Sequence, residues 1–382
     1  MADIGLNQNL EVGSRRFHIQ TATNVEDGSV RSEIFEDGKL LYVENFKYER
    51  RNSKEDLGIE PRLRTSVDKL HRLILHELDS LFEISEILMQ QDDDSPNEKI
   101  GLVFLHMRIF DKAEIHFKRV INLNPERFSS YIYLARCYFM QGRTSLAYKS
   151  VTELLNRKVD YADLHNLMGL ILMEKKRYVN AFKYFQIALK KNPSYTEVYL
   201  NLTEAILLRI QALKEESKDD EIEKTINFLK VVLKKVERVG GLADRQLVNR
   251  LLTILKKEGI KKALSILHKY KEDNYVRKMP AEIVGYEFFL RLRYLNEELT
   301  EEVLDSFEEK IANELERNSD FPDLWNYLAL IHLMQCRLFF LKGLGNFKES
   351  TRINPNFEKA QKNLRLVEND GREFLTLINA LV

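Results

Sequence analysis

Histidines are the first candidates for metal binding or acid–base chemistry in this chain. Eight occur among its 382 residues. His71 and His76 are five positions apart, which separates them by about 140° around a helix, so they cannot face one metal ion together. His106 and His116 fall in different expected helices. We therefore interpret all eight as surface residues or as hydrogen-bonded core residues.

Cysteines and clustered carboxylates could also bind metal. Cys137 and Cys336 are too few and too far apart for a disulfide framework or a zinc site. Both lie in apolar helical stretches, which indicates small buried side chains. The adjacent residues Asp92, Asp93 and Asp94 lack the glycine and the spacing of an EF-hand loop. A solvated loop before a helix N-terminus explains them, because negative charge is favourable there.

The common catalytic motifs do not occur in this sequence. It contains no phosphate-binding G-x-x-x-x-G-K-[ST], no G-x-G-x-x-G, no H-E-x-x-H and no nucleophile elbow. We therefore predict no catalytic residue, no metal site, no cofactor and no enzymatic activity.

The overall composition is that of a helical protein. Hydrophobic residues make up 44% of the chain and charged residues 31%, with only 15 Gly and 7 Pro. The first residues lack the basic and apolar segments of a signal peptide. No stretch approaches 18 uncharged apolar residues, so we predict no transmembrane helix and no membrane insertion. The sequence favours a cytoplasmic protein.

Charge is balanced overall but segregated along the chain. Lys+Arg and Asp+Glu both number 59, whereas residues 224–278 hold fifteen lysines and arginines against five acids. Residues 297–320 hold two against ten. One interpretation is that the basic and acidic stretches are solvated faces or neutralise each other. The other is that the basic stretch 224–278 binds an acidic protein, phosphate or nucleic acid. Few aromatic residues lie in it, so nucleic acid is the less favoured partner.

A repeat of 34 residues organises the middle of the chain. Four pairs of identical residues are 68 positions apart: Gly101 and Gly169, Ala113 and Ala181, Phe117 and Phe185, Pro125 and Pro193. Ala147 lies midway between Ala113 and Ala181, 34 positions from each. A fixed period of this length is typical of stacked supersecondary units.

These residues fit a known pattern. The third unit reads Met168-Gly169, Leu172, Ala181, Phe185 and Pro193. This resembles the tetratricopeptide repeat (TPR) family, whose units read W-x2-L-G-x2-Y, then A-x3-F, then P. The resemblance covers residues 94–213 and returns at 322–367, where Trp325 and Pro355 are two residues further apart than in a standard unit. We therefore expect an extended turn between two helices there.

The predicted fold is mainly α: a TPR-type right-handed α-solenoid of antiparallel helix pairs, preceded by a small three-stranded antiparallel β-meander. Five segments are expected, in the following order. They are a β-module over 1–60, an amphipathic connecting or capping helix over 61–91, regular TPR units over 94–213, degenerate TPR-like pairs over 214–320, and a last TPR-like unit with C-terminal capping helices over 321–382.

The resemblance also implies a binding groove. In the TPR family the first helices of successive units line a concave surface. Carried over to this sequence, its partner-binding positions are Leu102, Leu105, His106, Ile132, Arg136, Phe139, Met140, Asn166, Leu170, Met173, Leu200, Glu204 and Leu207. This strip is largely apolar, which suits an amphipathic or extended partner segment. The alternative is that the N-terminal helix, the C-terminal tail or the far end of the superhelix covers it.

The N-terminal module is expected to be β-structure. Asp37-Gly38 between apolar runs is a strong hairpin signal, and a second Asp-Gly pair precedes residue 29. Strands are predicted at about 15–23, 29–35 and 39–49, with Leu40 and Tyr42 on one face. A three-stranded sheet is only marginally stable by itself, so we expect it to pack against the nearest apolar surface, the helix at 66–90. The module is either a lid on the first repeat or a second docking site, because its outer strands are open edges.

The sequence thus predicts a non-enzymatic adaptor that binds protein partners in a TPR groove. The alternative is a nucleic-acid- or phosphate-binding helical repeat protein that uses residues 224–278. Self-association through a β-edge or the C-terminal tail is a further expectation.

Overall fold

The chain forms two compact units, each of which is described by itself. The computed structural model describes residues 4–24, 28–47, 59–276, 280–295, 299–315 and 321–381. Unit 1 combines Met1–Val103 with Pro280–Val382, and unit 2 is Phe104–Met279. The sheet and the C-terminal helices, which the sequence places in separate segments, thus lie in one unit.

Unit 1 begins with a four-stranded antiparallel sheet. Its strands are β1 (Gly5–Val12), β2 (Arg15–Asn24), β3 (Ser29–Glu36) and β4 (Lys39–Lys47), in the order β1-β2-β3-β4. The predicted three strands are β2 to β4, and β1 was missed because most of its side chains are exposed and carry no apolar alternation. The edge strands are therefore β1 and β4, and β2 is internal.

Two tight turns set the register of the sheet. Asp37 and Gly38 have φ of 49° and 72°, which confirms the predicted two-residue hairpin. Gly13 and Ser14, with φ of 56° and 62°, make the same kind of turn between β1 and β2. The predicted turn before residue 29 lies partly outside the described residues.

A bulge in β4 changes the predicted facing of its residues. Tyr42 pairs with Ile34, but Leu40 pairs with Phe35, so Leu41 is the extra residue. Leu40 and Tyr42 therefore lie on opposite faces of the sheet, where strict alternation predicted one face. Tyr42 and Ile34 are buried, whereas Leu40 and Phe35 are half-buried.

The buried face of the sheet packs on the long helix α1 (Ile59–Met89), as the sequence predicts. Phe17 and Phe82 meet edge to face with ring centroids 5.8 Å apart. A Cβ atom at Gly13 would lie 2.5 Å from the Phe82 ring, so the first hairpin also needs glycine here for close approach. The Thr21 hydroxyl contacts His71 Nδ1 at 2.9 Å, which links sheet and helix through a buried polar contact.

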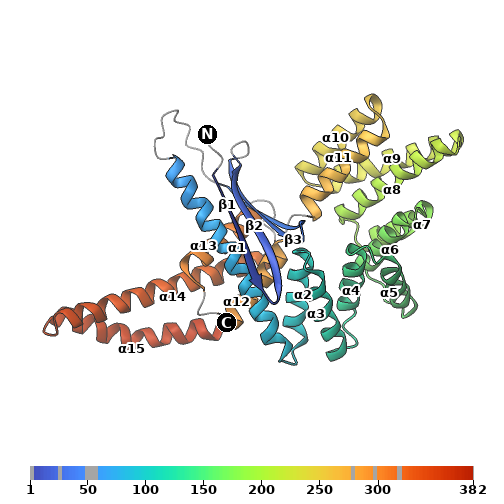
Figure 1. Cartoon of the computed structure of the whole chain (residues 1–382). Helices are drawn as coiled ribbons and strands as arrows, with labels where there is room; N and C mark the ends of the chain where they lie inside the picture. Colours follow the sequence, from blue (N-terminus) through green and yellow to red (C-terminus); the bar gives the residue numbers. More distant parts are fainter. Residues whose placement is uncertain are drawn as a thin grey trace. The chain divides into compact units, whose positions relative to one another are not determined.

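Four further helices of unit 1 come from the other end of the chain. They are α12 (Ala281–Tyr294), α13 (Glu301–Leu315), α14 (Pro322–Ile353) and α15 (Glu358–Leu381). Helices α12 and α13 pack against α1, and α14 and α15 run side by side (Figure 1). Helix α2 (Asp94–His106) spans the division between the units.

A buried cluster of charges joins the sheet to these helices. Lys310 of α13 places its Nζ 3.5 Å from Glu44 Oε1 of β4 and 3.6 Å from Glu77 Oε2 of α1. On α12, Arg291 Nε lies 3.6 Å from Glu287 Oε1, and both side chains are almost fully buried. Burial, followed by the negative charge of Glu77, raises the pKa of Glu287 to about 7. Charges from four elements are thus held together inside unit 1.

Helix α14 corrects the expected end of the repeat. The sequence predicts two helices and an extended turn between Trp325 and Pro355, but one 32-residue helix covers 322–353. Gly343 and Gly345, the residues best suited to a turn, have no positive φ and remain helical. The turn comes only at 354–357, where Pro355 prevents the helix from continuing.

Within the part of the chain that the structure describes, α14 also has the length and composition to cross a membrane. Its most apolar 18-residue window has a mean hydropathy of 1.3, and 11% of that window is buried. The stricter requirement for 18 uncharged residues missed it because Arg337 interrupts the apolar stretch. Length and hydropathy alone do not identify a membrane-spanning helix, because the core helix of a soluble protein has the same length and composition.

Unit 2 is an array of antiparallel helix pairs, the TPR-type α-solenoid that the sequence predicts. Its elements follow one another along the chain: α3 (Phe110–Leu123), α4 (Phe128–Met140), α5 (Thr144–Asn156), α6 (Ala162–Glu174), α7 (Tyr178–Lys191), α8 (Thr196–Glu215), α9 (Asp219–Val239), α10 (Leu242–Lys257), α11 (Ile260–Lys271) and the π-helix η1 (Glu272–Val276). Ala113, Ala147 and Ala181, one period apart, are fully buried.

The first helix of each regular pair ends in the same turn. Arg108, Gly142 and Lys176 are 34 residues apart and have φ of 60°, 74° and 58°. The amide after each of them donates to the carbonyl five residues earlier, as Arg177 N does to Leu172 O at 2.8 Å. This is the Schellman pattern, which reverses the chain into the second helix. Gly169 faces Phe185 so closely that a Cβ there would overlap the ring.

The last helix pair of unit 2 packs differently from the others. Helix α10 lies against α9, and α11 lies against α8, so the second helix of this pair contacts the first helix of the preceding one (Figure 1). In the regular part of the array, by contrast, the first helices α4, α6 and α8 follow one another. The α10–α11 pair thereby closes the inner side of the array at α8.

Candidate partner-binding groove

The thirteen predicted groove residues fall into three groups. Leu102 belongs to unit 1 and is not placed relative to the rest. Six residues are buried in the core of unit 2: Leu105, Ile132, Asn166, Leu200, Glu204 and Leu207. Six are half-buried: His106, Arg136, Phe139, Met140, Leu170 and Met173. None of these twelve is exposed as freely as the side chains of an open groove would be.

The chain's own helix α11 occupies the α8 end of the inner surface. Glu204 Oε1 lies 2.8 Å from His268 Nε2, and Glu204 Oε2 lies 2.5 Å from Lys271 Nζ. Burial alone would raise the pKa of Glu204, but hydrogen bonds from His268 and Lys271 and the charge of Lys271 lower it to about 2. Glu204 is therefore an ionised anchor for α11, with Leu200 and Leu207 buried beside it on α8.

The segment after α11 continues this closure. Tyr270 and Tyr275 both donate to Asp244 Oδ1, at 2.8 and 3.2 Å, which ties η1 to α10. Glu272 of η1 lies 3.9 Å from Arg108, in the turn that follows α2. Residues from the two ends of unit 2 therefore approach each other, and the far end of the array covers part of the inner surface. This corresponds to one of the alternatives that the sequence leaves open.

Asn166, a predicted groove residue, is hydrogen-bonded inside the array and does not face an open groove. Its Oδ1 accepts a hydrogen bond of 3.0 Å from Asn201 Nδ2, and both side chains are buried. The contact joins α6 to α8. In this structure Asn166 therefore stabilises the stacking of adjacent pairs.

The half-buried group lies at the middle of the array and is centred on Arg136. The positive charge of Arg136 acts on both His106 and Tyr195, which come from the preceding and following parts of the chain. Burial, assisted by Arg136, lowers the pKa of His106 to about 3, so this histidine is neutral at physiological pH. Phe139 and Met140 lie three and four residues after Arg136, on the same side of α4. Leu170 and Met173 are half-buried on α6, which contacts α4.

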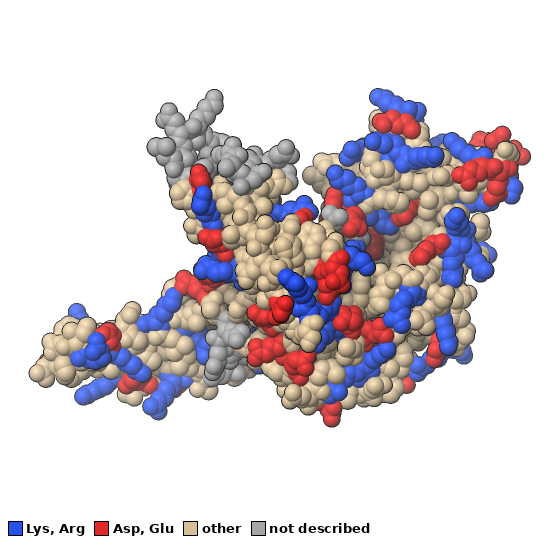
Figure 2. Space-filling model, in the orientation of Figure 1, with Lys and Arg blue, Asp and Glu red and all other residues tan. Residues whose placement is uncertain are grey.

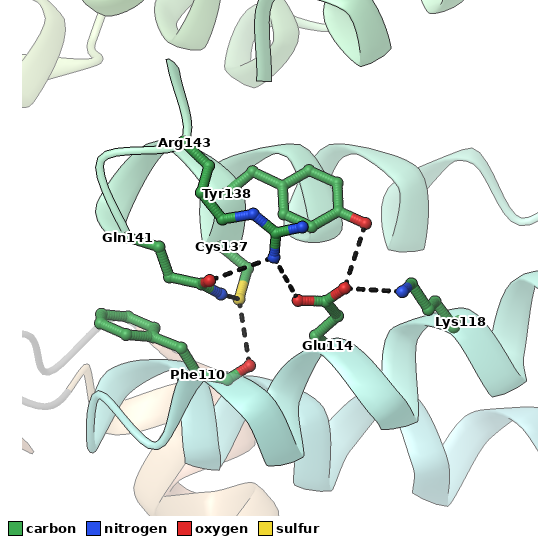
Figure 3. A network of polar contacts seen from close by, with 7 residues as sticks. All are labelled: Phe110, Glu114, Lys118, Cys137, Tyr138, Gln141 and Arg143. Atoms are coloured by element: carbon green, nitrogen blue, oxygen red, sulfur yellow. Dashed lines mark hydrogen bonds and ion pairs between the residues drawn. The ribbon is translucent and has the colours of Figure 1, made fainter. Parts of the chain in front are cut away.

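A polar network on α3 and α4 holds the Arg136-bearing helix in place (Figure 3). Glu114 Oε2 lies 2.8 Å from Arg143, and Glu114 Oε1 lies 2.6 Å from Lys118. The Arg143 guanidinium also stacks over the Tyr138 ring at 4.5 Å. Cys137 Sγ donates to the carbonyl of Phe110, and burial raises the pKa of this thiol to about 11. Cys137 is therefore an inert packing residue, as the sequence predicts, whereas Cys336 is exposed.

A second candidate surface lies on α9, α10 and α11, where lysines and arginines gather in Figure 2. Twelve exposed cations form no ion pair with any residue that the structure describes. They are Lys224, Lys230, Lys234, Lys235, Arg238, Arg245, Arg250, Lys256, Lys257, Lys261, Lys262 and Lys269. The acidic stretch 297–320 belongs to the other unit.

Sequence reasoning missed the residues that close the inner surface. His268 and Lys271 are 64 and 67 positions from Glu204, and no motif or period connects them. Within the described ranges, no group of three or more His, Cys, Asp or Glu side chains could hold a metal ion.

Comparisons with known proteins give similarity in fold at low identity. No protein-family model matches the sequence, and no curated protein matches it. YrrB, a TPR protein with an unusual peptide-binding site, is 13% identical over 56% of this chain and 94% of its own, with a TM-score of 0.32.

Two further solved structures are similar to the same extent. TTC0263, a thermophilic TPR protein of Thermus thermophilus, is 17% identical over 63% of this chain and all of its own, with a TM-score of 0.31. PilF of Pseudomonas aeruginosa is 15% identical over 62% of this chain and 96% of its own, with a TM-score of 0.35. The assignment of the TPR-type fold rests on the helix pairs of this chain itself.

Proposed function

We propose that this protein is a non-enzymatic interaction scaffold whose TPR array binds a segment of a protein partner. The half-buried group around Arg136 carries this proposal. It combines a cation with Phe139, Met140, Leu170 and Met173, and methionine adapts to varied apolar partners. A mostly apolar segment with one carboxylate to meet Arg136 fits this chemistry.

The proposed binding site is smaller than the strip that the sequence predicts. Helix α11 already contacts Glu204, and Leu200 and Leu207 are buried. We therefore assign the partner to the inner surface of α4 and α6. The N-terminal sheet remains a proposed lid or second docking site, and cytoplasmic residence remains a prediction.

Partner capture by the intact protein tests the groove. We expect R136E/F139E to lose partners that the wild-type protein retains, because it reverses the cation and adds charge to the apolar surface. V179E is the matched control, since Val179 is 53% exposed on α7, the second helix of its pair. Equal capture by both variants, with unchanged helical content, would rule the groove out.

The basic surface on α9–α11 supports a second candidate function. Its twelve cations without ion pairs would attract a polyanion, and binding through phosphates would weaken steeply with salt. The test is retention of RNA or DNA at low salt, with K256E/K257E/K261E/K262E as the variant. No retention of the wild-type protein at low salt would exclude nucleic acid.

A further inference from the structure

One face of α15 carries an ordered stripe of exposed side chains. The spacing of three or four residues places them on one side of the helix. Its members are Lys359, Lys362, Leu366, Asp370, Glu373 and Leu377, and each is exposed. Leu366 and Leu377 are 50% and 56% exposed and supply the apolar members of this stripe.

The charges of the stripe are arranged so that two antiparallel copies of it would place opposite charges against each other. Lys362 precedes Leu366 by four residues and Asp370 follows it by four, while Lys359 precedes it by seven and Glu373 follows it by seven. In an antiparallel pair of identical helices centred on Leu366, each residue before the centre faces the residue equally far after it. Lys362 would then face the partner's Asp370, and Lys359 would face the partner's Glu373. The two-fold symmetry forms each contact twice.

These four charges have no ion-pair partner among the residues that the structure describes. The neighbouring Glu368, on another face of α15, does have one, because it lies 3.8 Å from Lys348 of α14. The stripe therefore leaves both its cations and its acids available for a partner. The exposed Arg365 and Arg372 also form no ion pair among the described residues, but they lie on another side of α15.

The hairpin also leaves apolar surface available around the stripe. From residue 335 onward, no side chain of α14 is fully buried, and only Ala360, Gly371 and Ile378 of α15 are buried among those described. Phe340 and Phe374 pack on each other with ring centroids 5.4 Å apart, and both remain half-buried. Two helices alone give these residues too few neighbours for complete burial. More helices, as in a four-helix bundle, would provide them.

We propose that this face of α15 pairs with the same face of a second copy of the chain, antiparallel and centred on Leu366. Each copy contributes the α14–α15 hairpin, so the contact forms a four-helix arrangement between two protein molecules. This partner is independent of whatever binds the groove in unit 2.

A lipid bilayer is the competing occupant of the hairpin, because α14 is apolar enough to span one. Helix α15 argues against it. It lies along α14 and carries exposed charges on every turn from Lys359 to Glu373. Moving such a helix into hydrocarbon is strongly unfavourable. The second copy instead offers an opposite charge to each charged member of the stripe.

Charge reversal in the full-length chain tests the pairing. We expect the wild-type protein to dimerise with rising concentration in sedimentation-velocity runs. K359E/K362E places acids opposite acids and should raise the dimer dissociation constant by at least about tenfold, as should D370K/E373K. An equimolar mixture of the two variants should form a heterodimer, and the quadruple variant should dimerise again.

A matched control separates the stripe from general charge effects. R365E/R372E changes the net charge by the same amount as K359E/K362E on the same helix, but the two arginines lie about 100° and 120° around the helix from Leu366, the centre of the stripe. It should dimerise like the wild-type protein. All of these positions are exposed or half-buried, so circular dichroism should show unchanged helical content.

Cross-linking tests the register. In a C336S background, L366C should form a disulfide between two copies under mild oxidation, because the symmetry axis passes through this position. L377C, eleven residues away on the same face, should not. A wild-type chain that stays monomeric or partitions into liposomes, a dimer that tolerates charge reversal, or cross-linking by L377C alone would each overturn the proposal.

Discussion

The two units of this protein differ in how their buried contacts are distributed along the sequence. In unit 2 the contacts repeat along the sequence, with fully buried alanines one period apart and Gly169 against Phe185. In unit 1, charges from β4, α1, α12 and α13 meet once, around Lys310. Repeated apolar contacts can be recognised from a single sequence, whereas a cluster assembled from distant segments cannot. The comparison also predicts how each unit responds to mutation.

The largest expected effect is the removal of Lys310 from the buried cluster. K310A would leave Glu44 and Glu77 buried without their cation and should destabilise unit 1 by about 3–5 kcal/mol. Hydrogen exchange followed by mass spectrometry should show the loss in β4 and α13 but not in α6 and α7. K342A, which removes an exposed ion pair to Glu301, is the control and should cost about 0–1 kcal/mol. Equal effects of the two substitutions would contradict the comparison.

The two units should also respond to pH in opposite directions. Glu204 has a pKa lowered to about 2, so its contribution is complete above 4.5 and is lost as the pH falls toward 2. This contribution is roughly 3 kcal/mol. Glu287 has a pKa raised to about 7, so unit 1 should lose stability as the pH rises from 4.5 to 7. Thermal unfolding from pH 2 to 7, with E204Q and E287Q, measures both slopes, the Glu204 slope below 4.5 and the Glu287 slope above it. Unchanged slopes in either variant would show that another group is responsible.

Glycine substitution should have opposite signs in the two units. G169A forces a methyl group into the Phe185 ring and should destabilise the array by about 1–3 kcal/mol. G343A is on α14, where a Cβ would meet no atom within 4 Å. It should stabilise this helix by about 0.5–1 kcal/mol, because alanine favours the helical backbone. Chemical denaturation that gives the same sign for both would refute this assignment of the two glycines.

The smallest effect concerns the turn positions. Lys176 has a φ of 58°, which is unfavourable for a side chain with a Cβ, so K176G should be neutral or stabilising by up to about 1 kcal/mol. Cys336 occupies the corresponding position after Trp325 but lies inside α14. C336G should therefore destabilise by about 0.5–1 kcal/mol. A stabilising C336G would indicate that a turn is favoured there in solution.

These positions also show what the sequence could and could not predict. The period, the small residues and the prolines predicted the helix pairs of unit 2, because each pair repeats the same local contacts. They did not predict where a helix ends when the turn residue is Arg108 or Lys176, since neither is a typical left-handed residue. Because the residue type at these positions does not show whether a helix ends there, α14 was expected to be two helices.

The candidate site was predicted in part. The family pattern identified Arg136, Phe139, Met140, Leu170 and Met173, and these remain half-buried in the middle of the array. It could not predict that Glu204 anchors α11, because this depends on the reversed packing of α10 and α11.

The division of unit 1 between both ends of the chain has a consequence for its synthesis. A ribosome releases the N-terminal sheet and α1 first, but their partners α12 and α13 follow the entire array. The array can fold as soon as it has emerged, whereas β1–β4 and α1 must wait with apolar surface uncovered. We therefore expect the second unit in the sequence to fold before the first is complete, against the usual N-terminal order. A nascent chain stalled after residue 279 should bind chaperones through its N-terminal segment.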